Sequence, residues 1–313
     1  MRSHTMPANK PQIITTKQAK AQVNTLGISL IIYISLLLLL WHGSSLVARY
    51  APQAFMGYDA DLITMVFVSV MILFVAFVPF SISARRLRLP IRDYLQKPDI
   101  TFSKLMALCC MGTGIMLIVL FVVSIFGNFF GTELGDYAFI GAFTSTDNII
   151  KNIVYFVLTV LIQPICDEYI FRGIIQRQLG HYNRYFGVLA SSVLYALAQS
   201  SIADAAIAVF LGWFLALVTL RYHSIKPAIR IHIFTSFFTW LIIALPERFV
   251  IIPTIMIVLI YIVVALSLFN RTINYRIARH GAAEPKLWKI VFTSWTIITC
   301  MILFLINNFL GLL

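Results

Sequence analysis

The chain has 313 residues, 60% of them hydrophobic and 12% charged, and its mean hydropathy is +0.90. Because soluble domains carry about 25% charged residues, this composition excludes an ordinary soluble domain. Apolar runs of about 18 residues or more recur along the whole chain, which predicts an all-α, polytopic membrane protein. Basic loops that face anionic lipid headgroups explain the net charge of +12. Membrane lipids are therefore expected partners, and nucleic acid is not.

The apolar runs predict eight to nine transmembrane helices. The fifth and sixth runs are close together and the sixth is short, so the count depends on this pair. The other runs are long enough to cross the hydrocarbon core of a bilayer. The expected spans are 26–47, 62–83, 105–130, 152–176, 186–203, 205–220, 228–245, 250–269 and 290–310.

The basic residues predict how the chain is oriented. If the N-terminus is cytoplasmic, 21 of the 24 Lys and Arg residues fall in cytoplasmic segments, in agreement with the positive-inside rule. The exceptions are Arg49, Lys151 and Arg248. The first apolar run begins near Leu26 without a clear cleavage site, so we expect an uncleaved anchor after a polar tail. We therefore predict a multi-pass protein of the bacterial plasma membrane with a cytoplasmic N-terminus.

The loops between the predicted spans are too short to form a soluble domain. The four cysteines lie in apolar spans without any CxxC spacing, which predicts buried free thiols. We divide the chain into a cytoplasmic tail (1–24), N-terminal transmembrane helices (25–150), a central core (151–246) and C-terminal transmembrane helices (247–313).

Two adjacent carboxylates, Asp167 and Glu168, follow the uncharged stretch 152–166, and Arg172 comes one turn later. An ionised carboxylate at membrane depth costs about 2.5–3.5 kcal/mol on insertion scales, so such residues are usually functional. Glu168 and Arg172 are spaced i, i+4 with the acid first, which predicts an ion pair. Since adjacent helical residues point about 100° apart, Asp167 faces elsewhere and is the candidate reactive carboxylate. The alternative is a charge pair that snorkels at the end of a span, and it applies to Glu168 and Arg172 more than to Asp167.

Two further pairs place polar side chains on helix faces in later spans. Tyr195 and Gln199 share one face, and His232 and Ser236 share another. Taken alone, an intramembrane glutamine is usually an interhelical contact, and a histidine near the start of a span is usually an interfacial residue. These two pairs become informative because they follow the acidic pair in a fixed order along the chain.

Together the three segments resemble the CPBP family of CAAX proteases and bacteriocin-processing (Abi) proteins. DEYIFRGIIQRQL is similar to the family's EExxFRG…L motif, and YALAQ and HIFTS stand where the family has FxxxH and HxxxN or HxxxD. The resemblance covers residues 166–245. It implies a helical intramembrane protease core in which the first acid and the second-motif histidine activate a water molecule. The third-motif histidine and asparagine are implied to stabilise the oxyanion.

Three of the four chemically important positions depart from the family pattern. Asp167 is one methylene shorter than glutamate, and Gln199 can orient a water but cannot accept its proton. Ser236 can still donate to an oxyanion over a shorter reach, and only His232 is kept. No cofactor or metal is expected, because Gln199 removes a ligand and no HExxH pattern occurs. The resemblance implies catalytic positions Asp167, Glu168, Gln199, His232 and Ser236, with Arg172 and Tyr195 as structural residues at the site.

Two functions of different classes stay open at this point. One is an intramembrane peptidase that hydrolyses a membrane-associated peptide or protein by carboxylate-activated water, with activity weakened or lost through these departures. The other is a non-catalytic scaffold on the protease fold that binds and regulates another membrane or cell-envelope protein. The family assignment requires the motif side chains to converge on one cavity. Because helix rise places Gln199 about 20 Å and His232 about 6 Å from their cytoplasmic ends, convergence predicts staggered or tilted helices.

Overall fold

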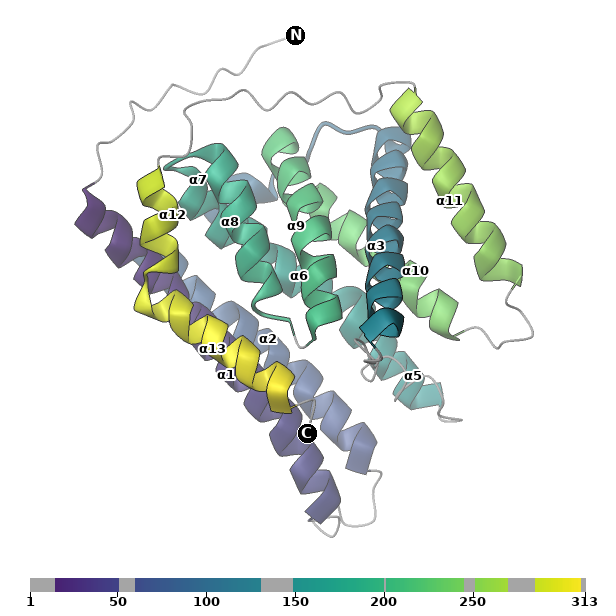
Figure 1. Cartoon of the computed structure of the whole chain (residues 1–313), viewed down its shortest axis with the longest axis horizontal. Coiled ribbons are helices and arrows are strands. Elements are labelled where there is room, and N and C mark those ends of the chain that lie inside the picture. The colour runs from purple at the N-terminus through teal and green to yellow at the C-terminus, as the bar shows by residue number, and fades with distance from the viewer. Residues whose placement is uncertain are drawn as a thin grey trace.

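The computed structural model describes residues 15–50, 60–130, 149–199, 201–244, 251–269 and 285–310, and helices are the only regular elements within these ranges. The long helices run between two ends of the molecule (Figure 1). One end carries α7 (Gln176–Gly180) and α12 (Pro285–Phe292). The opposite end carries α5 (Ile149–Phe156) and the connection between α8 (Arg184–Ala196) and α9 (Ile202–Tyr222). The predicted all-α, polytopic membrane fold is confirmed.

The described ranges contain fewer clear membrane spans than the sequence predicts for the whole chain. Five helices within the described ranges are long and apolar enough to cross a membrane, and a sixth span results if a helix pair bent by 56° counts as one. The count of eight to nine is therefore not confirmed. The five helices are Thr16–Leu40, Leu62–Arg86, Phe102–Val123, Ile149–Gly180 and Ile202–Tyr222, and the bent pair is Lys286–Phe292 with Trp295–Asn307.

One of the predicted spans is too short in the structure. Helix α8 (Arg184–Ala196) has 13 residues, whereas α11 (Ile251–Phe269) has 19. At 1.5 Å per residue, 13 residues measure about 20 Å, which is less than the roughly 30 Å of a hydrocarbon core. The prediction joined α8 to the apolar residues that follow it, because hydropathy alone does not register where a helix stops.

A helix cap explains why α8 does not continue. The backbone N–H of Asp204 donates to the Ser201 hydroxyl, and that hydroxyl donates to the Asp204 carboxylate. Such a reciprocal arrangement marks a helix start, because it satisfies donors that the first helical turn leaves free. Helix α9 (Ile202–Tyr222) therefore begins as a separate element directly after α8.

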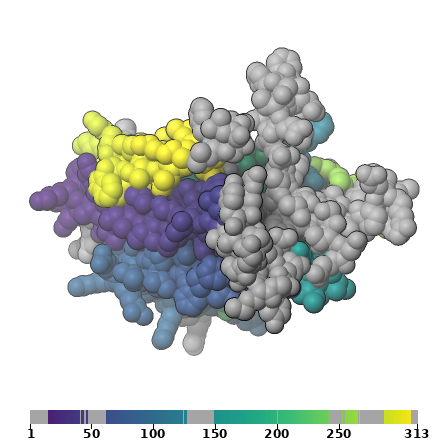
Figure 2. Space-filling view, turned by 90° about the horizontal axis from the view of Figure 1, so that it is seen from below, coloured from purple at the N-terminus to yellow at the C-terminus, as the bar shows by residue number. Residues whose placement is uncertain are grey.

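The N-terminal and C-terminal parts of the chain pack against each other. Figure 2 shows α1 (Thr16–Tyr50) in purple between α2 (Ala60–Arg86) in blue and the C-terminal helices in yellow. The C-terminal helices are α12 (Pro285–Phe292) and α13 (Trp295–Leu310). Helix α1 begins inside the predicted tail of residues 1–24, and the division of the chain into four parts stays a prediction.

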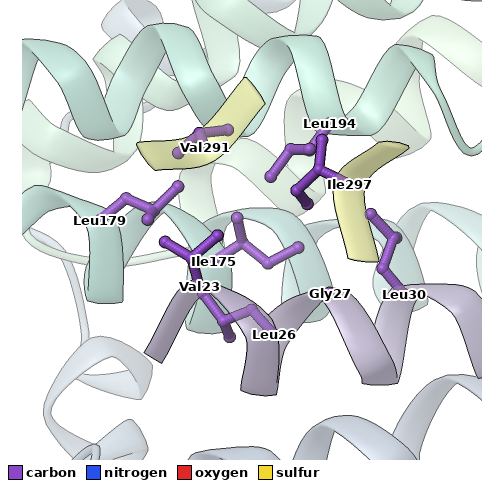
Figure 3. Close-up of a pocket in the computed structure, with 9 residues that line it drawn as sticks. All are labelled: Val23, Leu26, Gly27, Leu30, Ile175, Leu179, Leu194, Val291 and Ile297. Carbon is purple, nitrogen blue, oxygen red and sulfur yellow. The ribbon is translucent and has the colours of Figure 1, made fainter. Parts of the chain in front are cut away.

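Helices α1 and α13 approach so closely that their crossing needs a glycine. A Cβ atom at Gly27 would lie 2.0 Å from the Thr296 hydroxyl oxygen. The void beside this crossing has a volume of about 10 Å³, room for about one water, and its lining is apolar (Figure 3). We therefore regard it as a packing defect rather than a ligand site. It is lined by Val23, Leu26, Gly27, Leu30, Ile175, Leu179, Leu194, Val291 and Ile297.

The site is carried by a central helix of alternating geometry. Two of its segments, η3 and η4, are π-helical, a form that occurs mostly as short insertions and frequently at functional sites. The acidic pair lies at the junction of an α-helical and a π-helical segment. The segments are α5 (Ile149–Phe156), η3 (Val157–Ile162), α6 (Gln163–Asp167), η4 (Glu168–Ile175) and α7 (Gln176–Gly180).

Helices α8, α9 and α10 (Lys226–Ala244) surround this central helix, and α3 (Phe102–Phe130) covers α9 and α10. Asn183 caps α8 by accepting hydrogen bonds from the backbone N–H groups of Tyr185 and Phe186. In Figure 1, α10 runs obliquely to α3 and α9. This tilt agrees with the predicted inclination of helices around the motif side chains. A 3₁₀ turn, η2 (Ile91–Leu95), lies between α2 and α3.

Candidate functional site

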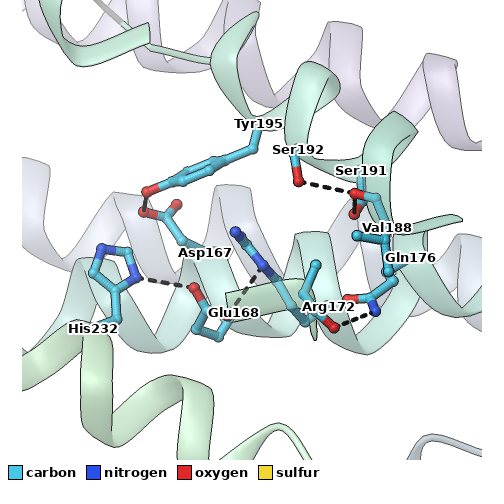
Figure 4. Close-up of polar contacts among 10 residues, drawn as sticks. Asp167, Glu168, Arg172, Gln176, Val188, Ser191, Ser192, Tyr195 and His232 are labelled. Atoms are coloured by element: carbon cyan, nitrogen blue, oxygen red, sulfur yellow. Dashed lines mark hydrogen bonds and ion pairs between the residues drawn. The ribbon is translucent and has the colours of Figure 1, made fainter. Parts of the chain in front are cut away.

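Asp167 is held by two tyrosines that belong to different helices. The Tyr195 hydroxyl of α8 donates to Oδ2 of Asp167 over 3.1 Å (Figure 4), and the Tyr33 hydroxyl of α1 donates to Oδ1 over 3.5 Å. Asp167 is buried, with 3% of its surface exposed. A buried carboxylate needs such partners, because an unpaired charge in the interior is costly. The tyrosines therefore fix where the carboxylate points.

Glu168 lies in the interior between a cation and an imidazole. Its Oε2 is 3.3 Å from Nε of Arg172, and its Oε1 is 3.0 Å from Nδ1 of His232. The predicted i, i+4 ion pair is therefore present, although the segment is π-helical rather than α-helical. The contact with His232 was not predicted, since the two residues lie in different motifs. Glu168 thus ties η4 to α10.

Arg172 is enclosed completely, and its guanidinium packs against flat surfaces. Its Cζ lies 4.7 Å from the centre of the Tyr195 ring, a cation–π distance. On α9, a Cβ atom at Gly212 would be 2.8 Å from Nη2 of Arg172, so only glycine leaves room there. Among the described residues, no hydrogen-bond partner reaches Nη1 or Nη2. Glu168 and the tyrosine ring therefore carry the stabilisation of this buried charge.

The cavity beside Asp167 collects most of the predicted site residues. Its volume is about 190 Å³, enough for several water molecules or part of a peptide. Glu168 and Arg172 lie outside its lining and act from behind it. The predicted residues that line the cavity are Asp167, Tyr195, Gln199, His232 and Ser236.

Gln199 has an interaction that limits what its amide can do. Its Nε2 donates to the backbone carbonyl of Tyr195 over 3.2 Å, which leaves the side-chain oxygen as an acceptor at the cavity. An amide oxygen can hold a water by accepting a hydrogen bond, but it takes no proton from it. Gln199 is therefore suited to orienting a water and not to activating one.

Two groups at the cavity can accept a proton. One is the Asp167 carboxylate. The other is the His232 ring, because an Nδ1–H that donates to Glu168 leaves Nε2 with a lone pair. A carboxylate behind an imidazole fixes its tautomer and stabilises the imidazolium, the arrangement that histidine bases use in hydrolases. The geometry thus provides a pair of candidate bases on one wall, with the Ser236 hydroxyl as a donor on the same helix as His232.

Two residues around Asp167 carry no motif signal in the sequence. Tyr33 contacts Asp167 from α1, far from the motifs in the chain, and a tyrosine in an apolar span is ordinary. Asp204 lines the cavity and accepts a hydrogen bond from the N-cap Ser201, and the sequence alone placed it in a loop. Within the described ranges, no group of three or more His, Cys, Asp and Glu side chains gathers to hold a metal ion.

Comparison with protein families identifies this part of the chain. Residues 149–238 match a family described as type II CAAX prenyl endopeptidase Rce1-like. This part of the chain is similar to that family, and it makes up less than half of the 313 residues. No curated protein and no solved structure matches the chain. The resemblance to the CPBP family of CAAX proteases is therefore confirmed over these residues.

The Rce1-like region begins with α5 and ends within α10. It contains the acidic pair, Gln199, His232 and Ser236, so the departures from the family pattern all lie inside the matched region. Tyr33, which holds the other oxygen of Asp167, lies outside it. The chain is a multi-pass membrane protein with a CAAX-type intramembrane-protease fold in its core.

Proposed function

We propose that the Rce1-like region hydrolyses a peptide bond of a membrane-associated peptide or protein through carboxylate-activated water. One observation carries the proposal: Asp167 and His232 face the same cavity, and each is held from behind by a hydrogen-bonded side chain. Positioning of this kind is what converts a polar pocket into a catalytic one, because reacting groups must stay within near-attack distance.

The proposed reaction needs no covalent intermediate. Gln199 orients a water, and Asp167 takes one of its protons as the water oxygen attacks the carbonyl carbon. The oxyanion that forms accepts a hydrogen bond from the Ser236 hydroxyl. His232 donates a second hydrogen bond in the ring state that carries a hydrogen on Nε2. The carbon–nitrogen bond then breaks, and the proton held by Asp167 passes to the leaving nitrogen. Glu168 acts through His232 by fixing its orientation and is a positioning residue.

Replacement of Asp167 by asparagine tests this assignment. Purified protein in lipid is given a library of membrane-soluble peptides, and cleavage is followed by mass spectrometry. Since general-base catalysis contributes about 10²–10⁴-fold, we expect Asp167→Asn to lose at least two orders of magnitude in rate. Asp204→Asn is the matched control, because it also changes a cavity carboxylate to an amide, whose oxygen can still accept from the hydroxyl of the N-cap Ser201. Equal rates for Asp167→Asn and wild type would remove Asp167 from the mechanism.

A non-catalytic scaffold is the second candidate, and Gln199 is the observation that favours it. Its amide is bound to the Tyr195 carbonyl and cannot serve as the family's second-motif histidine. In this alternative the cavity binds a segment of another membrane or cell-envelope protein without cleaving it. The variant Gln199→His separates the two functions. Cleavage by the variant alone favours the scaffold, whereas robust cleavage by the wild type excludes it.

A further inference from the structure

The cavity extends from Asp167 toward one end of the helices only. On the central helix its lining includes Asp167 and Pro164 and extends back through Gln163 and Thr159 to Tyr155, about three turns before Asp167. On α10 the lining continues to Trp240, about two turns beyond His232. These residues all lie on the side of the acidic pair where α5 begins and α10 ends.

The lining residues near α8 and on α9 also lie toward this end of the helices. Gln199 follows the last turn of α8, and Asp204 lies in the first turn of α9, so the cavity reaches the α8–α9 connection. Both side chains are partly exposed, whereas Asp167 and His232 are buried. Exposure thus increases from the acidic pair toward this end, which places the mouth of the cavity there.

The opposite side of the acidic pair is closed by packed polar side chains. Glu168 and Arg172 have no exposed surface, and Gln176 is 6% exposed and donates to the Ala216 carbonyl (Figure 4). None of these three residues lines the cavity. A substrate therefore cannot reach Asp167 from the α7 end without breaking these contacts.

The closed end is also the basic end of the molecule. Arg177 lies in α7, Arg184 begins α8, Arg221 lies in the last turn of α9, and Lys226 begins α10. By the positive-inside rule, helix ends with this concentration of Lys and Arg face the cytoplasm. The mouth of the cavity, at the other ends of the same helices, then faces the non-cytoplasmic side.

We infer that the cavity is entered from the non-cytoplasmic side of the membrane and takes an internal, apolar peptide segment from there. The bound segment is a substrate only under the proposed peptidase function, and in this respect the inference rests on that function. The segment is internal because two carboxylates, Asp167 and Asp204, line the cavity, and its described lining contains no Lys or Arg. A free carboxyl terminus would meet like charges there, which costs affinity. The apolar side chains of the opposite wall, such as Leu211, suit the hydrophobic part of such a segment.

Cysteine labelling in whole cells tests the side of entry without any catalytic readout. Thr239→Cys places a thiol in the cavity, Ile202→Cys marks the proposed mouth side, and Tyr185→Cys marks the basic end. The wild type serves as the blank, because its four cysteines are buried. A membrane-impermeant maleimide is added to intact cells and then to lysed cells.

We expect Thr239→Cys and Ile202→Cys to label in intact cells to a similar extent, and Tyr185→Cys to label only after lysis. Labelling of Thr239→Cys only after lysis would overturn the inference, and so would an absence of labelling under both conditions. Failure of the peptidase proposal would instead appear as missing cleavage with the labelling pattern intact.

The internal nature of the segment is tested by protection of the same thiol. Two peptides of identical apolar sequence, acetylated at the amino end, are compared, one amidated and one with a free carboxyl terminus. We expect the amidated peptide to slow labelling of Thr239→Cys more than the free acid does. Equal or stronger protection by the free acid would overturn the assignment of an internal segment.

Discussion

At Arg172 a full positive charge lies in the interior of a membrane protein, with no exposed surface. Glu168 neutralises it at 3.3 Å, the Tyr195 ring covers one side, and the absence of a side chain at Gly212 makes room on another. The charge therefore depends on one carboxylate more than on any hydrogen bond from its terminal nitrogens. A buried pair of this type is weak evidence for net stability, yet either partner alone is strongly destabilising.

This dependence gives a prediction for paired substitutions. Arg172→Met leaves Glu168 without its cation and is expected to cost about 3–5 kcal/mol, measured as a lower Tm in detergent. The double variant Glu168→Gln with Arg172→Met removes both charges, so its Tm is expected to lie above that of Arg172→Met alone. If the double variant is the less stable of the two, the pair is not the coupled unit that the geometry indicates.

The residues at the site differ in how far the sequence could identify them. The ion pair of Glu168 and Arg172 follows from i, i+4 spacing, and the gathering of Gln199 and His232 at Asp167 follows from the family resemblance. The contact of Glu168 with His232 and that of Tyr33 with Asp167 do not follow, since they join segments far apart in the chain. Spacing rules describe neighbours on one helix and say nothing about which helices meet.

At the scale of the helices, α7 and α8 form the tightest contact beside the site. A Cβ atom at Gly187 would lie 2.6 Å from the backbone nitrogen of Gly180 and 2.8 Å from the Gln176 carbonyl oxygen. Backbone atoms cannot rotate away as a side chain does, so a methyl group there would move one helix as a whole. Since α8 carries Tyr195, such a movement would also loosen the hold on Asp167.

The two glycines of this contact, Gly187 and Gly180, provide a matched pair of variants. Gly187→Ala is expected to lower the Tm by the equivalent of about 1–3 kcal/mol, the usual cost of overpacking, and to reduce any cleavage. Gly180→Ala lies on the facing helix, and its added Cβ would meet no atom within 4 Å. It is expected to match the wild type in both measurements. Equal Tm values for the two variants would contradict the close crossing.

The sequence predicts the helices well where one apolar stretch forms one helix, and poorly where an apolar stretch is divided between two helices. The spans near 62–83 and 205–220 correspond to membrane-crossing helices of the structure, Leu62–Arg86 and Ile202–Tyr222. The span predicted at 186–203 failed because the cap at Ser201 divides an apolar stretch into two helices. The π-helical segments η3 and η4 were not predicted, because hydropathy does not distinguish a π-helix from an α-helix.

At the scale of the whole molecule, the first and last helices of the chain support the site in the Rce1-like region. Helix α1 is outside the family match, yet it supplies Tyr33 to Asp167 and crosses α13 at Gly27. The C-terminal helices therefore hold α1, and α1 in turn reaches the site. Tyr33 lies six residues after Gly27, about 9 Å along the helix, so a displacement at the crossing extends to the Asp167 carboxylate.

Gly27→Ala tests this connection across the molecule. Alanine is a better helix former than glycine by about 1 kcal/mol, so by propensity alone the substitution stabilises α1. The added Cβ, however, would lie 2.0 Å from the Thr296 hydroxyl oxygen and 2.5 Å from the Thr296 Cβ, and the two helices must separate. We expect a lower Tm in detergent and a slower cleavage rate. Gly43→Ala, on the same helix, brings its Cβ no closer than 4.0 Å to a neighbour and is expected to raise or keep the Tm. Should Gly27→Ala be as stable and as active as Gly43→Ala, the contact between α1 and α13 has no part in positioning Asp167.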